Sequence, residues 1–316
     1  MTHPTPRTRP WAGALGALVA SSLLRALSSQ AGDVPSRGDA TRGAVIFALA
    51  GGCGCHTPAG GPVGAGGTAI ETPFGKFYST NITSDRRTGL GEWSDEEIDR
   101  ALRSGRLRDG SAESPVMPYD QYAGMADSDA GDLIAYLRTL PPVEREDRPH
   151  EVSLPLPRLA FAAWRWLFAE RPTAPAVAPT TGVERGRYLS NHVGTCGDCH
   201  TPRNRFGVRD GARYLAGVAK GPRGELVPNI TSDPATGIGG WDEEEIAGLL
   251  KSGFKPDFDN VQGLMAEMID GIGGGAGLGQ APESDLQAIA AYIKKVPPIA
   301  NALHSRDSSA GTKGEK

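Results

Sequence analysis

Cysteine is scarce in this chain, and so are aromatic residues. Only four of the 316 residues are cysteine, and aromatic residues make up 6% of the total. All four cysteines stand beside histidines, in two short motifs at 53–56 and 196–200, so none is left for a framework of structural disulfides. Because Gly (43) and Pro (25) are numerous and apolar residues reach only 39%, we expect modest cores and many loops.

A positive net charge and long apolar runs are also missing. The formal net charge of −4 argues against nucleic acid as a partner and suits steering toward a basic patch on another protein. The apolar run at 11–24 is shorter than the roughly 20 residues that a membrane-spanning helix needs. The length of 316 residues indicates about two domains.

The motif Cys196-Gly197-Asp198-Cys199-His200 has the spacing used for covalent attachment of a c-type haem. Two thiols at this spacing add to the haem vinyl groups as thioethers, and the adjacent histidine becomes the proximal ligand of the iron. We therefore predict that Cys196 and Cys199 bind a haem c and that His200 ligates its iron. A zinc site made from the two cysteine pairs is the alternative, but it leaves the histidines unexplained.

The upstream motif, Cys53-Gly54-Cys55-His56, is a contracted version of the same pattern. Gly52 stands where the first cysteine is expected, while Cys55 and His56 keep the standard relation. We predict a second haem c here, attached through Cys53 and Cys55 and ligated by His56. The number of thioether bonds is left open, because Cys53 either bonds through a distorted loop or remains a free thiol.

Residues 1–31 resemble an export signal. Arg7 and Arg9 precede the apolar run, and Ser29-Gln30-Ala31 is a cleavage site of the small-residue type. The alternative is an uncleaved N-terminal anchor. Export agrees with haem c chemistry and predicts a periplasmic protein, either free or attached to the inner membrane. The polar stretch 301–316 is predicted to be a disordered tail.

Between these ends the sequence repeats itself. Asn81–Asp85 recurs as Asn229–Asp233, with each Asn expected to cap a loop. Each copy continues to a Trp and a helix start, where Ser94 with Glu97, and Asp242 with Glu245, predict capping boxes. We place a first domain at 32–143, a Pro-rich linker at 144–182 and a second domain at 183–300. The linker holds an apolar stretch at 154–168, which either packs across both domains or docks on a membrane or partner subunit.

Two methionines align across the repeat. Met117 and Met265 lie 148 residues apart, each downstream of one motif and before the last predicted helix of its domain. We predict that they are the sixth ligands of the two irons, with Met125 and Met268 as the alternatives. Histidine–methionine ligation fills both axial positions, so the expected chemistry is electron transfer. His192, near the second motif, is expected to be a surface or packing residue, with iron ligation as the alternative.

The stretch Phe74–Thr83, the Met117-Pro118-Tyr119 motif and the Met265-Ala266-Glu267 motif resemble the multihaem cytochrome c subunits of bacterial membrane-bound dehydrogenases. These are the alcohol, gluconate, sorbitol and fructose dehydrogenase types. The resemblance covers residues from about 40 to 300. It implies an all-α fold of two tandem class I cytochrome c domains. It also implies relay of electrons from a flavin- or quinone-containing catalytic subunit toward ubiquinone or a terminal oxidase.

These observations predict a periplasmic dihaem carrier that is not itself an enzyme. Its expected partners are a dehydrogenase catalytic subunit and a downstream oxidase or cytochrome, with membrane association and without nucleic acid. The alternative is a dihaem redox enzyme, such as a peroxidase or thiosulfate dehydrogenase. In such an enzyme, one haem has an open or non-methionine sixth position.

Overall fold

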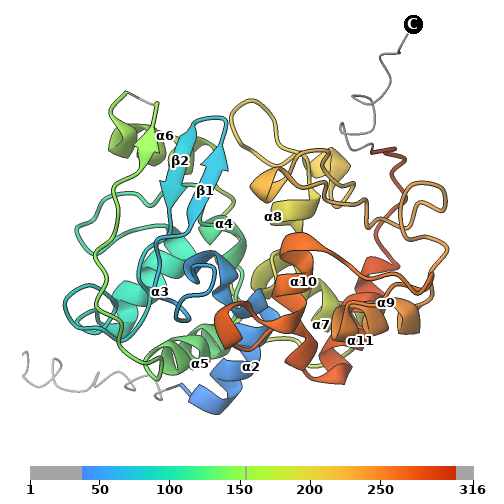
Figure 1. Ribbon diagram of the computed structural model, residues 1–316, viewed down its shortest axis with the longest axis horizontal. Helices are drawn as coiled ribbons and strands as arrows, with labels where there is room; N and C mark the ends of the chain where they lie inside the picture. The colour runs from blue at the N-terminus through green and yellow to red at the C-terminus, as the bar shows by residue number, and fades with distance from the viewer. Residues whose placement is uncertain (1–37, 154, 304–316) are drawn as a thin grey trace, which may run out of the picture. The chain divides into compact units, whose positions relative to one another are not determined.

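The computed structural model describes residues 38–153 and 155–303 (Figure 1). All of these residues belong to one compact unit. The predicted export signal at 1–31 and most of the predicted tail at 301–316 lie outside the described residues. The bounds of the two predicted domains stay a prediction.

The described part of the chain is mostly helical, and its first half contains one small sheet. The elements of this half, in chain order, are α2 (Ala40–Leu49), the 3-10 helix η1 (Gly51–His56), β1 (Ala69–Thr72), β2 (Gly75–Tyr78), α3 (Asp95–Ser104), α4 (Tyr119–Tyr122) and α5 (Asp127–Leu137). The segment that follows contains β3 (Glu151–Val152) and α6 (Pro157–Phe168).

The second half has a similar order of helices without a sheet of its own. Its elements are α7 (Gly182–Tyr188), the π-helical turn η2 (Leu189–Val193), α8 (Cys196–His200), η3 (Gly211–Arg213), η4 (Pro222–Gly224), α9 (Glu243–Ser252), α10 (Gly263–Asp270), η5 (Ile272–Gly274), η6 (Leu278–Gln280) and α11 (Glu283–Ile293). One hydrophobic core contains buried residues from both halves.

Each half is built on two helices that cross in close contact, α2 with α5 and α7 with α11. A glycine sits at each crossing. A Cβ atom on Gly43 would lie 1.9 Å from the carbonyl oxygen of Asp132, and one on Gly186 would lie 1.7 Å from that of Ala288. Only glycine allows the two backbones to approach this closely.

An ion pair stands beside each glycine. The guanidinium of Arg42 binds both carboxylate oxygens of Asp132, at 2.6 and 2.9 Å. Arg185 binds Asp285 in the same two-pronged way, at 2.9 and 3.1 Å. Two interactions therefore hold each crossing in place: the glycine allows close backbone contact, and the arginine before it forms a bidentate ion pair.

The two predicted capping boxes are confirmed. Ser94 and Glu97 bond to each other's backbone N–H at the start of α3, and Asp242 and Glu245 do the same at the start of α9. These contacts satisfy amides that the first turn of a helix leaves without partners.

The linker region contains structure that the sequence did not reveal. β3 extends the β1–β2 hairpin to a three-stranded antiparallel sheet. The apolar stretch of the linker forms α6, whose Phe161 is buried beside Phe77 of the sheet. The indole N–H of Trp164 donates to the carbonyl of Phe206 in the second half, at 2.9 Å. One face of α6 therefore contacts both halves of the chain.

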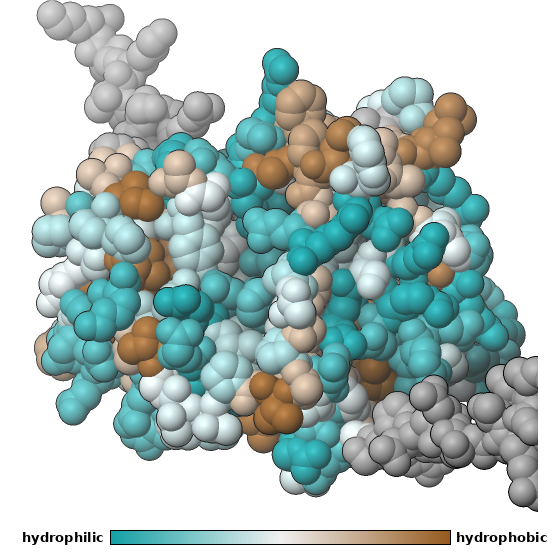
Figure 2. All heavy atoms as spheres, turned by 180° about the vertical axis from the view of Figure 1, so that it is seen from behind, coloured by the Kyte–Doolittle hydropathy of each residue, from teal (hydrophilic) through white to brown (hydrophobic). Residues whose placement is uncertain are grey.

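The other face of α6 is open to solvent. Trp166 is 75% exposed, and Leu159 and Leu167 are exposed as well. Seen from behind, hydrophobic side chains gather at the side of the molecule where α6 lies (Figure 2). Among the described residues, no helix combines the length and the apolar character needed to cross a membrane.

We predict that Gly43→Ala destabilises the holoprotein by about 1–3 kcal/mol, because the added methyl group collides with the backbone of α5 and forces the helices apart. Gly248→Ala is the matched control. Gly248 lies inside α9 with open space around it, so this change should stabilise the protein by about 0.5–1 kcal/mol. Denaturant unfolding of both variants measures the difference. Equal stabilities would show that the crossing tolerates a side chain.

Candidate functional site

The second motif forms the short helix α8. Thr195 precedes it with a left-handed backbone (φ 44°) that turns the chain into the helix. Cys196 and Cys199 are free thiols and are partly buried. Burial raises the pKa of Cys196 to about 11, so its thiol is protonated at neutral pH. The helix carries both thiols and His200 within five consecutive residues.

The first motif has a different backbone. Gly51, Gly52 and Cys53 are left-handed in succession, and the motif forms the 3-10 helix η1. A left-handed conformation is costly for a residue with a side chain, so Cys53 (φ 47°) is strained by roughly 1–2 kcal/mol. Its side chain packs against the hydrophobic core, and burial raises its pKa to about 12. Cys55, in contrast, is exposed and directly precedes His56.

The two imidazole rings are held in the same way. Nδ1 of His56 lies 2.8 Å from the carbonyl oxygen of Thr80, and Nδ1 of His200 lies 2.9 Å from that of Pro228. A carbonyl oxygen only accepts hydrogen bonds, so Nδ1 carries the proton and Nε2 keeps its lone pair. Burial also lowers the pKa of both histidines, which favours the neutral ring. Each Nε2 is therefore prepared to ligate a metal ion.

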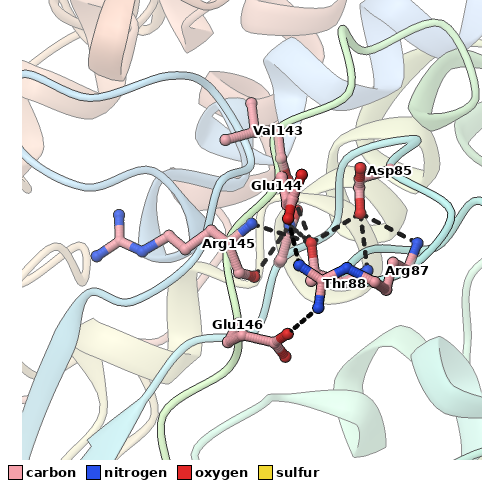
Figure 3. Close-up of polar contacts among 8 residues, drawn as sticks. Asp85, Arg87, Thr88, Val143, Glu144, Arg145 and Glu146 are labelled. Atoms are coloured by element: carbon pink, nitrogen blue, oxygen red, sulfur yellow. Dashed lines mark hydrogen bonds and ion pairs between the residues drawn. The ribbon is translucent and has the colours of Figure 1, made fainter.

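The carbonyls that hold the rings come from loops with matching hydrogen bonds. Oδ1 of Asn81 accepts hydrogen bonds from the N–H and the hydroxyl of Thr83. Oδ1 of Asn229 accepts the same two hydrogen bonds from Thr231. The prediction that these asparagines cap loops is confirmed. In the first half, Thr88 and Arg87 tie this loop to the segment after α5 (Figure 3): Thr88 binds Asp85 and the N–H of Arg145.

Arg87 also pairs with Glu144 and Glu146. These ion pairs lie at the surface and add little stability, but they close the loop over the segment that follows the last helix of the half.

The methionines fall into two groups. Met117 and Met265, predicted as axial ligands, are partly buried beside the shared core. The two alternatives have structural contacts instead. Met125 is completely buried in the core, and the side chain of Met268 packs on Gly51, where an added Cβ would lie 2.4 Å from its methyl group. The ligation of iron by Met117 and Met265 stays a prediction.

The second half covers the motif of the first. Helix α10 contacts η1, and the glycine-rich loop after α10 follows it (Figure 1). Cδ1 of Ile272 would lie 2.3 Å from a Cβ on Gly54, so the loop presses directly on the contracted motif. No local pattern could reveal its role, since it depends on contacts about 200 residues away in the chain.

Groups of one motif also affect the pKa of a thiol in the other motif. Burial, then the nearby Asp198 carboxylate, then Cys55 raise the pKa of Cys199. The effect of Cys55 on the pKa of Cys199 indicates that these two thiols lie near each other. Buried Tyr122 stands there too, because burial and the charges of Cys53, Cys55 and Asp198 raise its pKa.

His192 lies where the two halves of the chain meet. Its Nδ1 lies 2.8 Å from the carbonyl oxygen of Gln121, and its ring packs on Gly124. The expectation that it is a packing residue is confirmed. Tyr188, which the sequence did not single out, makes a second link: its hydroxyl donates to Asp129 at 2.7 Å and accepts from the N–H of Ala126 at 3.1 Å.

The donor set fits two haem groups better than one zinc ion. Among the described residues, no three Cys, His, Asp or Glu side chains come together in a way that could hold a metal ion. The four thiols form no disulfide. Each half instead offers thiols beside an imidazole with a free Nε2, and a methionine at the edge of the core, which are the groups that bind haem c.

Comparisons with known proteins agree with this assignment. The Cytochrome c family model matches residues 40–141. A diheme cytochrome c-type protein of Cereibacter sphaeroides is 41% identical over 273 residues, which cover 83% of this chain and 87% of that protein.

Two dehydrogenase subunits are also similar. The cytochrome c subunit of alcohol dehydrogenase (quinone) from Gluconobacter oxydans is 35% identical, over 82% of this chain and 55% of the subunit. The fructose dehydrogenase cytochrome subunit of Gluconobacter japonicus is 37% identical, over 81% of this chain and 52% of the subunit. The chain thus spans about half the length of these two subunits.

Serine variants of the first motif test which thiol bonds the haem. We expect Cys55→Ser to release the haem of the first half when the protein is denatured, because Cys55 is exposed and keeps the standard position before His56. We expect Cys53→Ser to retain it, because Cys53 packs into the core. The mass of the denatured chain measures bound haem. Loss of haem from the Cys53 variant would instead assign the bond to Cys53, and Cys199→Ser is the control in the second half.

Proposed function

This chain belongs to the family of diheme cytochromes c and dehydrogenase cytochrome c subunits, and from that membership we propose that it is a dihaem electron carrier. Electrons would pass from a dehydrogenase to the two haems and then toward the respiratory chain. The supporting observation is the matched pair of imidazoles, each held through Nδ1 by a backbone carbonyl beside free thiols.

The haem irons supply one-electron oxidation and reduction, while the chain sets their surroundings. Cys55, Cys196 and Cys199, with Cys53 as the open case, hold the porphyrins covalently. His56 and His200 would ligate the irons through Nε2. Met117 and Met265 would supply the second protein ligand of each iron, which would raise the reduction potential and leave no position for oxygen or peroxide.

The contact between the halves supports transfer from one haem to the other. Cys55 of the first motif acts on the pKa of Cys199 in the second, and α10 of the second half packs on η1 of the first. Hydrogen bonds from Tyr188 and His192 fix the halves against each other. A fixed geometry keeps the haem separation constant, so that little reorganisation accompanies each electron transfer.

The proposed redox partners are supported by the names of the relatives, and the proposed location is supported by the sequence. Relatives named as cytochrome subunits of alcohol and fructose dehydrogenases support a dehydrogenase as the electron donor. The exposed apolar face of α6 supports a docking surface for such a subunit. The predicted export signal supports a periplasmic location, free or attached to the inner membrane, with an oxidase or another cytochrome as acceptor.

Leucine variants test the axial ligands. We expect Met117→Leu and Met265→Leu each to remove about half of the far-red absorption band that methionine sulfur gives to ferric haem. Met125→Leu and Met268→Leu are matched controls, because leucine conserves volume and these methionines have packing contacts. Absorption spectra of the oxidised holoproteins give the comparison. Loss of the band in a control variant, with the proposed ligand variant unchanged, would reassign the ligand.

Carbon monoxide separates the carrier from a dihaem peroxidase or thiosulfate dehydrogenase. A haem with both axial positions filled should show no spectral change when carbon monoxide is added to the reduced protein. Potentiometric titration should give two reversible one-electron steps per chain, and peroxide should not be consumed. Rapid binding of carbon monoxide to one haem, with peroxide turnover, would support the enzyme instead.

A further inference from the structure

A pocket of about 510 Å³ lies between α3, α4 and the C-terminal end of α6. Small-molecule sites in proteins have volumes of roughly 300–1,000 Å³. Neither Cys–His motif and neither of the predicted methionine ligands lines this pocket. None of the residues predicted to bind haem therefore belongs to its lining.

The lining of the pocket is strongly basic, although the chain as a whole is acidic. Two acids, Asp99 and Glu170, line it together with five arginines, which are Arg100, Arg103, Arg106, Arg165 and Arg171. Arg103 is neutralised by Asp99, with contacts of 2.6 and 2.9 Å. Within residues 38–153 and 155–303, the other four arginines form no ion pair, so the pocket keeps an excess of positive charge.

Two polar atoms of the lining are buried and have no hydrogen-bond partner within the described part of the chain. They are the hydroxyl of Tyr119, a residue only 1% exposed, and Nε of Arg165. Both residues line the same pocket. Buried polar groups almost always have a partner, so two unsatisfied donors at one pocket indicate a missing acceptor.

The donors have fixed directions. Another nitrogen of Arg165, NH1, donates to the carbonyl of Ser104 at 3.1 Å, which anchors the guanidinium at the end of α3. The ring of Tyr119 packs edge-on against Trp164, with ring centroids 6.4 Å apart.

We propose that this pocket binds a small soluble molecule that carries at least two carboxylate or phosphate groups. Guanidinium groups bind both kinds of oxyanion through paired N–H donors, and a tyrosine hydroxyl adds a further donor. A cation would be repelled by the four unpaired arginines. A neutral ligand would leave their charge uncompensated. The pocket thus matches a dianion or trianion in both charge and size.

Titration calorimetry of the holoprotein with citrate and with inorganic pyrophosphate tests the proposal. We expect one anion to bind per chain. Arg100→Gln and Tyr119→Phe should each weaken binding by about tenfold, as the loss of one charge-assisted hydrogen bond predicts. Arg86→Gln is the matched control, because Arg86 is an exposed arginine outside the pocket lining. It should bind the anions as the parent protein does.

Thermal unfolding without anion separates a binding role from a structural one. Tyr119→Phe should not lower stability, because the lost hydroxyl has no partner in the described part of the chain. A clear loss of stability would show that the hydroxyl serves the fold and would overturn its assignment as a ligand donor. The proposal also fails if neither anion binds, or if both variants bind like the parent. Binding only to phosphatidylglycerol vesicles would likewise overturn it in favour of a lipid headgroup. In all these cases the haem spectra test electron transfer independently.

Discussion

The close crossing of the first and last helix in each half is the constraint on which the rest of the structure depends. Gly43 and Gly186 let the backbones meet, and the neighbouring arginines bind carboxylates on the opposite helix. The first Cys–His motif follows directly from the helix that carries this glycine, and the second follows after the turn η2. The crossing therefore fixes where both thiols and the imidazole emerge relative to the core, before any cofactor contributes.

Local patterns were the part of this structure that the sequence could predict. The capping boxes depend on residues three apart, and the asparagine loops on residues two apart, so both are visible in a short stretch. The Cys–His motifs are equally local. The starts of the last helices carry no such pattern: α5 begins at Asp127 and α11 at Glu283. These helices are positioned by packing against α2 and α7, and neither has a capping side chain.

What the sequence could not predict arises from contacts between distant segments. The strand pair β2–β3 joins residues about 75 apart, and the arginines of the basic pocket come from segments about 65 apart. Neither periodicity nor residue spacing predicts these long-range contacts, because each residue taken alone is an ordinary polar or extended residue. The two buried donors at the pocket became visible only when the burial of Tyr119 and Arg165 was known.

The contracted first motif and the glycine-rich loop of the second half belong together. A motif with one residue fewer leaves its backbone tight, and Gly51, Gly52 and Cys53 adopt left-handed conformations to close it. Ile272 then presses on Gly54 and Met268 on Gly51, so the second half covers the strained segment. Strain of this kind persists only where surrounding contacts hold it. The contracted motif of one half is therefore stabilised by the other half, which makes the two motifs a single structural unit.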